Sequence, residues 1–508
     1  MSYEANNIAK NSLYILSSRI ARIFVTIGFN IFFAHIFSIE EYAAIAVFDI
    51  LLHMTNIMSS FGLETTCLRE LPLLLENNER AKAAAMIKTS VCNRVFWSGV
   101  LAIIIFFNAE WLAELFFKEV HFVPIVKIMS LGVFFGSLNT SLDLLGQGTR
   151  AFKGTSIIQF ANAVAYSLSG ISLFLLFGYK GWIVGYTCAR GLGTILYIKL
   201  MWSWLRCNSG IANWKKMVRS SAPFYARGFM LFSLNKLDLL IIGIFAGPVA
   251  LGTYHVAKRL SSHIEMVYQS IGAPLIVRIA AMRGEQEELA SSYLRKISRY
   301  NSFLFIPLCF VVIAFGYPLL ELYGGRKYTD GYIILVILCM ARMVVGVWNG
   351  VYVRGVFTLG NPRDTLLVET VGSLVNTVFL LILIRTFGVT GVPLATLFSV
   401  VSIGAVAYFV LNRRLKVAFD FNAMGKSFIS AGALLSCAAV LQLICYNLYL
   451  IPLYLIVSIS VFLLIWIRYL EAEDIGIIES IFPRIAKPLM RVLRVLGLSE
   501  LTSDRNEE

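Results

Sequence analysis

Charged residues are scarce in this chain, because Asp, Glu, Lys and Arg make up only 15% of its 508 residues. Hydrophobic residues make up 58%, and the mean hydropathy is +0.75. A water-soluble protein of this length could not cover its surface with so few charges. The composition therefore excludes a soluble globular protein and predicts one that spans a membrane many times.

Other missing features exclude some activities. The eight cysteines have no paired, metal-type spacing, so the sequence predicts neither a disulfide framework nor a metal site. No Gly-x-x-x-x-Gly-Lys motif is present, which argues against direct coupling to ATP. The longest loop predicted outside the cytosol, residues 108–122, is apolar and has only Glu110, Glu114 and Glu119 as candidate acids. We therefore expect a protein that is not an enzyme and that has no cofactor.

Apolar segments follow one another from Asn11 to Ile467, and only short polar breaks separate them. A helix needs about 20 mainly apolar residues to cross roughly 30 Å of hydrocarbon. Cutting the chain at its polar, Gly and Pro breaks gives about fourteen such segments. They are residues 11–36, 42–63, 89–107, 123–145, 155–177, 181–204, 220–246, 250–277, 298–317, 331–353, 364–385, 389–411, 428–446 and 449–467. The sequence thus predicts an all-α polytopic membrane protein with about 14 transmembrane helices.

Basic residues predict the orientation of these helices. More than half of the 44 lysines and arginines fall on the same side as both termini, against five on the opposite side. Such an excess marks the cytosolic side of a membrane. We therefore expect both termini in the cytosol and the protein in the cytoplasmic (inner) membrane of a bacterium. The net charge of +14 then reflects anionic lipid at the inner leaflet and needs no nucleic acid partner.

The chain contains a weak internal repeat with a period of about 210 residues. The segment Phe177-Gly178-Tyr-Lys-Gly181 recurs as Phe387-Gly388-Val-Thr-Gly391, and two further matches keep the same order. Six spans is an even number, so both repeats have the same orientation, with a substrate site between them. The predicted parts are an N-terminal six-helix lobe (1–204), a cytosolic linker (205–219), a C-terminal six-helix lobe (220–411), two additional peripheral helices (412–467) and a basic cytosolic tail (468–508).

Polar residues inside the predicted spans form stripes on four helices. Polar groups are costly in hydrocarbon, so the face on which they recur indicates a wet or ligand-binding surface. The stripes fall on the first, second, seventh and eighth spans, which are symmetry mates in the repeat. The residues predicted to line a polar cavity are Asn30, Asn56, Asn235 and Gln269, and the candidates for sensing a coupling ion are Asp49, His53, Asp238 and Glu265.

Cations outnumber anions within the predicted spans. Four of them, Arg94, Lys127, Lys199 and Arg227, lie near span ends, where a long side chain reaches the interface. The remaining cations within the spans indicate a water-filled cleft that receives an anion. These are Arg19, Arg22, Arg190, Lys236, Lys258, Arg259 and Arg342. Two alternatives stay open: polar groups that only join helices by hydrogen bonds, and a structural ion pair of Asp49 with Arg19 or Arg22.

One run of residues resembles a recurrent signature of the polysaccharide transporter family. It extends from Asp238 to Leu260 and combines an acidic residue, an apolar stretch, a small-residue turn, Gly252-Thr-Tyr254 and a basic pair. Asn11-Ser-Leu-Tyr14 and Glu41-Tyr42 are similar to the opening of these proteins. The family comprises Wzx-type flippases for O-antigen (lipopolysaccharide), capsule and exopolysaccharide units. Its superfamily also contains MATE exporters and MurJ-type lipid II flippases.

The resemblance implies two lobes around a central cavity that is lined by the four striped helices. It also implies alternating access that carries an undecaprenyl-pyrophosphate-linked oligosaccharide from the inner to the outer leaflet. Membrane lipids, a proton or sodium ion, and a polymerase of the same pathway are the further partners expected. A MurJ-like lipid II flippase and a MATE-like ion-coupled exporter are the alternatives. The central cations argue against the exporter, because its usual cationic substrates would prefer an acidic cavity.

Cysteine labelling tests the predicted orientation. A single cysteine introduced within residues 205–219 should react only from the cytosol, and one within 386–390 only from outside. The measurement is labelling of intact cells with a membrane-impermeant maleimide, in a variant whose native cysteines have been replaced. Labelling of the 205–219 site in intact cells would show that the orientation is wrong.

Overall fold

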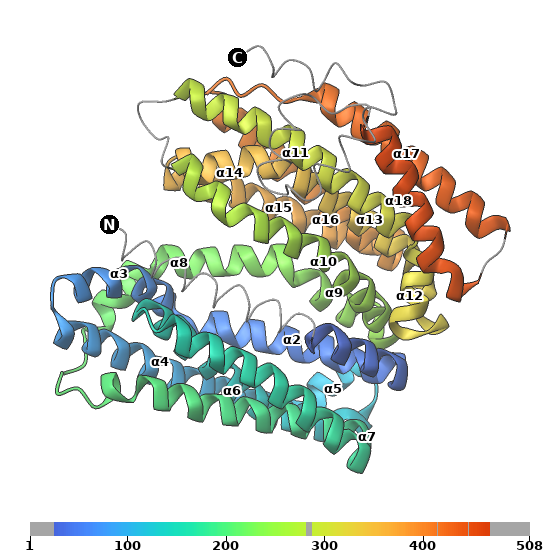
Figure 1. Ribbon diagram of the computed structural model, residues 1–508. Helices are drawn as coiled ribbons and strands as arrows, with labels where there is room; N and C mark the ends of the chain where they lie inside the picture. The colour runs from blue at the N-terminus through green and yellow to red at the C-terminus, as the bar shows by residue number, and fades with distance from the viewer. Residues whose placement is uncertain (1–24, 281–286, 414, 445–446, 468–508) are drawn as a thin grey trace. The chain divides into compact units, whose positions relative to one another are not determined.

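The computed structural model describes residues 25–280, 287–413, 415–444 and 447–467. Every regular element in this part of the chain is a helix (Figure 1), which confirms the predicted all-α architecture. The predicted tail, residues 468–508, lies outside the described residues. Helices such as α16 (Gly391–Asn412) and α18 (Ile451–Ile467) are apolar on all faces, as expected of helices surrounded by lipid and by other helices.

The helices follow one another with short connections. After the helical residues Val25–Ile36, the first half contains α2 (Ile39–Ser60), α3 (Leu63–Glu76), α4 (Arg80–Phe107), α5 (Ala109–Phe117), η1 (Val120–Phe122), α6 (Val123–Gly148), α7 (Phe152–Leu205), α8 (Trp214–Asn235) and α9 (Leu237–Phe245). The second half contains α10 (Gly247–Ala280), α11 (Glu287–Ala314), α12 (Gly316–Gly324), η2 (Arg326–Gly331), α13 (Tyr332–Val344), η3 (Val345–Asn349), α14 (Gly350–Leu359), α15 (Pro362–Phe387), η4 (Gly388–Thr390), α16, α17 (Phe421–Ile444), η5 (Leu448–Leu450) and α18.

The chain forms two compact units. Unit 1 consists of Met1–Lys258, Leu320–Ile334 and Glu369–Ser399, and unit 2 of Arg259–Leu319, Leu335–Val368 and Val400–Glu508. In unit 1, α6 packs against α2, α4 and α7; in unit 2, α17 packs against α11 and α18. These units are defined by contacts between residues, whereas the predicted lobes are defined by the sequence repeat. The predicted lobe boundaries therefore stay a prediction.

The helices accommodate the predicted spans. Within the described residues, nine helices are long and apolar enough to cross a membrane, or ten if the bent pair α8–α9 is one span. Two of them have room for two spans each, because α7 has 54 residues and the run Arg363–Asn412 has 50. At about 1.5 Å per residue, either is more than twice as long as a bilayer core is thick. The predicted total of about 14 is consistent with this arrangement.

The same turn interrupts both long helical runs, and it follows the internal repeat. Gly178 and Gly388 have φ angles of 65° and 61°, in the left-handed region that glycine adopts without steric cost. A Cβ atom added to Gly181 would lie 1.9 Å from the carbonyl oxygen of Leu173. One added to Gly391 would lie 2.1 Å from the carbonyl oxygen of Leu383, which is likewise eight residues earlier. Residues that match in sequence therefore make the same close approach, which supports the duplication.

A fully buried ion pair joins the N-terminal helices. The side chains of Arg94 in α4 and Glu64 in α3 are each 2% exposed, and Arg94 Nε lies 2.8 Å from Glu64 Oε1. Arg94 Nη1 also donates to the carbonyl oxygen of Asn56 and to the hydroxyl oxygens of Ser59 and Ser137. The guanidinium group thus holds the end of α2 against α3, α4 and α6.

This pair corrects the expectation for Arg94. Its position near a span end predicts a side chain that reaches the interface, but the structure buries it, with Glu64 as its partner. Glu64 lies just beyond the predicted end of the second span, so the sequence pattern does not single it out. A charged group buried without a partner costs several kcal/mol, which explains why the arginine requires this carboxylate.

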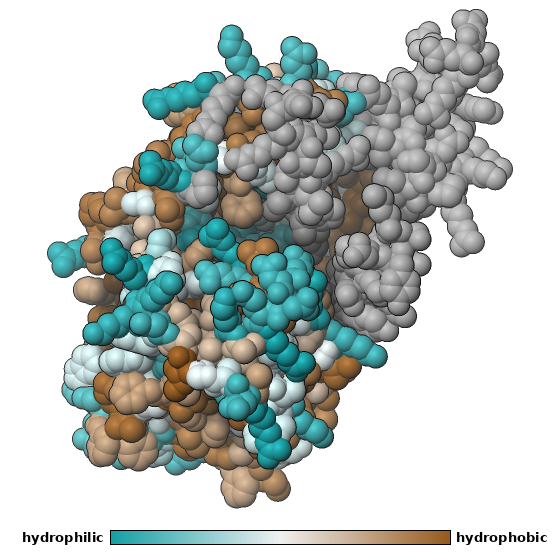
Figure 2. Space-filling model, turned by 90° about the vertical axis from the view of Figure 1, so that its left-hand side faces the viewer, coloured by the Kyte–Doolittle hydropathy of each residue, from teal (hydrophilic) through white to brown (hydrophobic). Residues whose placement is uncertain are grey.

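The surface of the protein matches a lipid environment. Figure 2 shows the end of the molecule at which α3 lies, and hydrophilic side chains gather on this face. Large apolar side chains are exposed elsewhere: Phe107 is 79% exposed and Leu443 is 86% exposed. Extensive apolar exposure is rare on proteins that face water and is expected where acyl chains are the solvent.

Removing Glu64 should destabilise the protein more than removing a surface carboxylate. Glu64→Gln leaves the buried Arg94 without its counter-ion, which should cost about 3–5 kcal/mol. The matched control is Glu79→Gln, which breaks the exposed pair with Lys82 and should cost less than about 1 kcal/mol. Thermal melting of the detergent-solubilised protein measures both. Equal melting temperatures for the two variants would contradict a structural role of the buried pair.

Candidate functional site

A break between α8 and α9 in unit 1 brings polar groups into a membrane span. The two helices are bent by 55°, and Lys236 lies at the break with a non-helical φ of −135°. A break within a span frees backbone groups that polar neighbours have to satisfy. Lys258 of α10 does so, because its Nζ donates to the carbonyl oxygen of Asn235 at 2.6 Å.

The first ion pair at this break joins α2 to Lys236. Lys236 Nζ lies 3.0 Å from Asp49 Oδ2, and the two side chains are 17% and 25% exposed. One turn further along α2, the exposed His53 has its Nδ1 3.1 Å from the Asp49 carbonyl oxygen. The pair of Asp49 with Arg19 or Arg22 stays a prediction, because both arginines lie outside the described residues. Asp49 thus neutralises Lys236.

The second ion pair joins α9 to α10. Lys258 Nζ forms an ion pair and a short hydrogen bond with Asp238 Oδ2, which also accepts a hydrogen bond from the hydroxyl of Tyr254 at 2.6 Å. Asp238 Oδ1 accepts from the backbone N–H of Leu239 at 2.8 Å. Asp238 lies in the first turn of α9, where the helix dipole favours a negative charge. The carboxylate is therefore held by several donors in addition to the lysine.

Arg190 of α7 has a neutral partner. Its Nε and Nη2 donate to the hydroxyl oxygen of Tyr186 at 3.1 and 2.5 Å, and its guanidinium lies 4.9 Å from the centroid of that ring. Among the described residues, no carboxylate lies within ion-pair distance of Arg190. The Asp49 carboxylate nevertheless acts on it electrostatically, as Lys236 and Lys258 act on His53. We call these six residues the charged cluster: Asp49, His53, Arg190, Lys236, Asp238 and Lys258.

A bidentate ion pair lies elsewhere in unit 1. Arg227 of α8 donates Nε and Nη2 to the two carboxylate oxygens of Glu369 in α15, at 2.8 and 2.7 Å. Its position near a span end predicts a side chain that reaches the interface, which stays a prediction, and the structure adds Glu369 as its partner. Bidentate geometry makes this one of the stronger kinds of ion pair.

Unit 2 contains a further pair formed by predicted site residues. Arg342 Nη1 of α13 lies 2.7 Å from Glu265 Oε2 of α10. Gln269, one turn along α10 from Glu265, is exposed, and its Nε2 donates to Glu265 Oε1 at 3.3 Å. Arg259, next to Lys258 in the sequence, is partly buried in α10. Arg342, like Lys236 and Lys258, is thus compensated by a carboxylate.

The predicted cavity asparagines differ in their surroundings. Asn30 is buried, and its Oδ1 has no hydrogen-bond partner among the described residues. The same holds for Oδ1 of the partly buried Asn56. Asn235 is exposed and donates to the carbonyl oxygen of Leu231 at 2.8 Å in its own helix. The role of these three asparagines in lining a substrate cavity stays a prediction.

The sequence pattern misses one buried arginine of unit 2. Arg354 is 5% exposed, its Nη2 donates to the Tyr268 carbonyl oxygen at 2.7 Å, and its guanidinium lies 4.0 Å from the Tyr268 ring centroid. The predicted span ends at residue 353, which places Arg354 in a loop. The π-helix η3 precedes it, and the extra residue of a π-turn rotates the following side chains. The periodicity of an ideal α-helix therefore does not predict that Arg354 is buried.

Polar contacts also join the end of helix Val25–Ile36 to the segment that contains η2, within unit 1. Lys327 Nζ donates to the carbonyl oxygens of His35, at 3.2 Å, and Phe37. In return, His35 Nε2 donates to the carbonyl oxygen of Leu322 at 2.9 Å. A cation at a helix C-terminus satisfies carbonyl groups that lack partners and complements the helix dipole.

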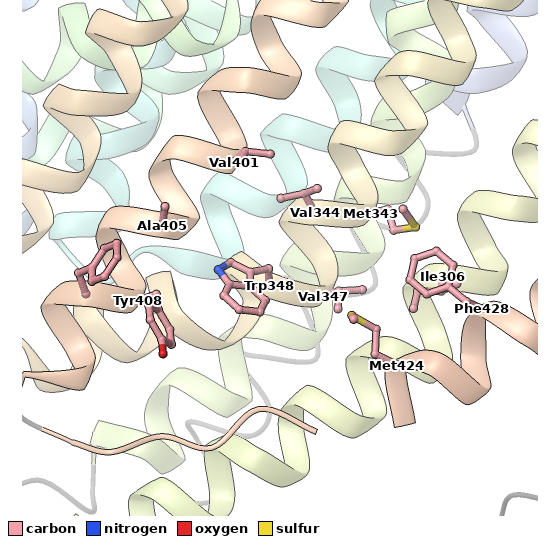
Figure 3. Close-up of a pocket in the computed structure, with 11 residues that line it drawn as sticks. Ile306, Met343, Val344, Val347, Trp348, Val401, Ala405, Tyr408, Met424 and Phe428 are labelled. Carbon is pink, nitrogen blue, oxygen red and sulfur yellow. The ribbon is translucent and has the colours of Figure 1, made fainter. Parts of the chain in front are cut away.

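An apolar cavity of about 470 Å³ lies in unit 2. It is formed by side chains of α11, α13, η3, α16 and α17, including Met343, Trp348 and Tyr408 (Figure 3). None of the described residues that line this cavity is charged, and the indole N–H of Trp348 donates to the Gly404 carbonyl oxygen at 3.2 Å. The cavity suits hydrocarbon, so an anionic group is better accommodated at the charged cluster.

Similar proteins include probable flippases. The chain is 23% identical over 204 residues to the probable low-salt glycan biosynthesis flippase Agl15 of Haloferax volcanii, which covers 39% of this chain and 43% of that protein. It is 25% identical over 206 residues to the probable flippase AglR of the same organism, covering 40% and 43%. The chain therefore matches less than half the length of these two relatives. An uncharacterized membrane protein of Methanocaldococcus jannaschii is 21% identical over 411 residues, covering 74% and 78%.

Solved structures with the same fold include transporters. The lipid II flippase MurJ in an inward closed conformation has a TM-score of 0.72 and 15% identity, covering 90% of this chain and 98% of that one. A mutant of the Vibrio cholerae MATE transporter VcmN has a TM-score of 0.58 and 12% identity, covering 81% and 98%. A family model described as "Polysaccharide biosynthesis protein" matches residues 32–332. The chain is thus a multi-pass membrane protein with the MurJ and MATE fold, and it belongs to the polysaccharide biosynthesis protein family.

Proposed function

We propose that this protein is a flippase of polysaccharide biosynthesis that moves an undecaprenyl-pyrophosphate-linked oligosaccharide from the inner to the outer leaflet. The observation that carries the proposal is the charged cluster, which places Arg190 in a candidate membrane span of unit 1, Lys236 at the break of the bent pair α8–α9, and Lys258 in α10, beside that break. Cations in such a place are costly unless they have a function or a partner. A pyrophosphate headgroup is an anion of the kind that they bind. The relatives described as probable flippases, one of them of glycan biosynthesis, support the coarser function of a flippase.

In the proposed cycle, the protein alternates between inward and outward openings. The predicted topology places His35 and Lys327 on the side away from the cytosol. The hydrogen bonds from Lys327 to the carbonyl oxygen of His35, and from the His35 ring to that of Leu322, would then hold that side closed while the headgroup enters from the inner leaflet. The lipid tail stays in the bilayer while the glycan passes through the protein. A proton or sodium ion, sensed at Asp49, His53, Asp238 or Glu265, would reset the cycle, and a polymerase of the same pathway would receive the product.

A lipid II flippase is the nearest alternative, because the fold is shared with MurJ and the headgroup chemistry is the same. A MATE-like exporter of cationic substrates is less compatible with three basic side chains in the charged cluster. The glycan distinguishes these functions. Mass spectrometry of lipid that co-purifies with the protein identifies it directly: a peptide-bearing disaccharide would indicate lipid II, and an oligosaccharide repeat would indicate the proposed substrate.

Arg190 provides the cleanest test of anion binding, because its removal leaves no ion-pair carboxylate behind. Arg190→Ala should cost roughly 1.5–3 kcal/mol of headgroup binding, about 10- to 100-fold in affinity. Arg190→Lys should restore only part of it, because lysine lacks the planar fork that fits phosphate oxygens. The readouts are surface polysaccharide and accumulation of the lipid-linked precursor at the inner leaflet.

The control is Arg385→Ala, which removes an exposed arginine at the end of α15. It should leave both readouts unchanged while the protein is inserted at the same level. If Arg190→Ala also leaves them unchanged, the anionic-headgroup proposal is wrong and a neutral substrate has to be sought.

A further inference from the structure

The two lysines of the charged cluster each have a built-in counter-ion. Asp49 neutralises Lys236, and Asp238 neutralises Lys258. An anionic substrate therefore does not meet bare lysines at this site. It has to compete with the two aspartates for the same ammonium groups.

The geometry of the first pair permits such an exchange. Asp49 and Lys236 are 25% and 17% exposed, whereas the structural pair Arg94–Glu64 is 2% exposed on both sides. Arg94 additionally donates to a backbone carbonyl and two hydroxyl groups, while the hydrogen bond of Lys236 Nζ goes to Asp49. A partly exposed pair with few other hydrogen bonds is held less firmly than a sealed one, so a competing anion can replace one partner at lower cost.

A displaced Asp238 would keep other donors. The hydroxyl of Tyr254 and the N–H of Leu239 bind its two oxygens, and the N-terminal end of α9 favours its charge. Asp49 is itself partly exposed, so it is not sealed in the interior when the lysine leaves. Asp238 is only 4% exposed, but the two remaining donors stay with it. A buried carboxylate with no donor at all would be prohibitive.

Resting on the proposed function, we infer that Asp49 and Asp238 are competing counter-ions that a pyrophosphate headgroup displaces from Lys236 and Lys258. A pyrophosphate diester has two negative charges and several acceptor oxygens, so it can engage both lysines at once, whereas each aspartate engages one. Displacement also releases α2 from the break between α8 and α9. Binding of the correct anion thus loosens a contact between helices, which neutral or cationic molecules do not do.

The inference predicts opposite effects for the two members of a pair. Asp49→Asn should tighten binding of undecaprenyl pyrophosphate by about tenfold, because the competitor is gone. Lys236→Gln should weaken it by about tenfold, because a phosphate ligand is lost. In the double variant the gain from Asp49→Asn should vanish. The measurement is a titration of the full-length, detergent-solubilised protein with undecaprenyl pyrophosphate, followed by microscale thermophoresis.

Two further comparisons make the test decisive. Glu79→Gln removes the same charge from an exposed pair with Lys82 and should not change the affinity, which excludes a general effect of net charge. Asp238→Asn with Lys258→Gln repeats the design on the second pair. If both aspartate variants bind equally or more weakly, or no longer fold in a melting assay, the aspartates are structural and the inference is wrong. If the wild-type protein does not bind undecaprenyl pyrophosphate, the proposed function itself fails.

Discussion

The high free-energy cost of a charge or an unpaired backbone group in hydrocarbon is the constraint on which the whole structure depends. It explains why every regular element among the described residues is a helix, since a helix satisfies its own backbone. It also explains why the break at Lys236 is accompanied by Lys258, whose ammonium group binds the carbonyl oxygen that ends α8. The same cost makes each charged residue within a span informative about function.

Ion pairs in this protein fall into two kinds, and their environment decides what they can do. Arg94 and Glu64 are sealed from solvent and surrounded by hydroxyl groups, so they fix the packing of α2, α3, α4 and α6. Asp49 and Lys236 are partly exposed, and the exchange of partners proposed above requires such a pair. A flippase of the proposed kind would use both, because one part has to stay rigid while its binding groups change partners.

The predicted repeats share one local structure, a glycine turn within each long helical run. The glycine turns at Gly178 and Gly388 have the same left-handed backbone, and each is followed by the same close approach to a carbonyl oxygen. The Arg94–Glu64 pair belongs to the predicted first repeat, and residues 302–307, about 210 positions after Arg94, contain no arginine. The predicted repeats thus share the glycine turn but not the buried ion pair.

The sequence by itself determined the helical architecture, because hydrophobic period is a local property, and it predicted the spans, the repeat and the polar faces. It also identified Asp49, Lys236, Asp238 and Lys258 as unusual. Only the tertiary structure decided which of them pair, since Asp49 and Lys236 meet across 187 positions of the chain. The buried partner of Arg94 could not be predicted from the sequence, because helix packing decides which residues meet. The π-turn before Arg354 could not be predicted either, because the hydrophobic period does not reveal a local one-residue shift of register.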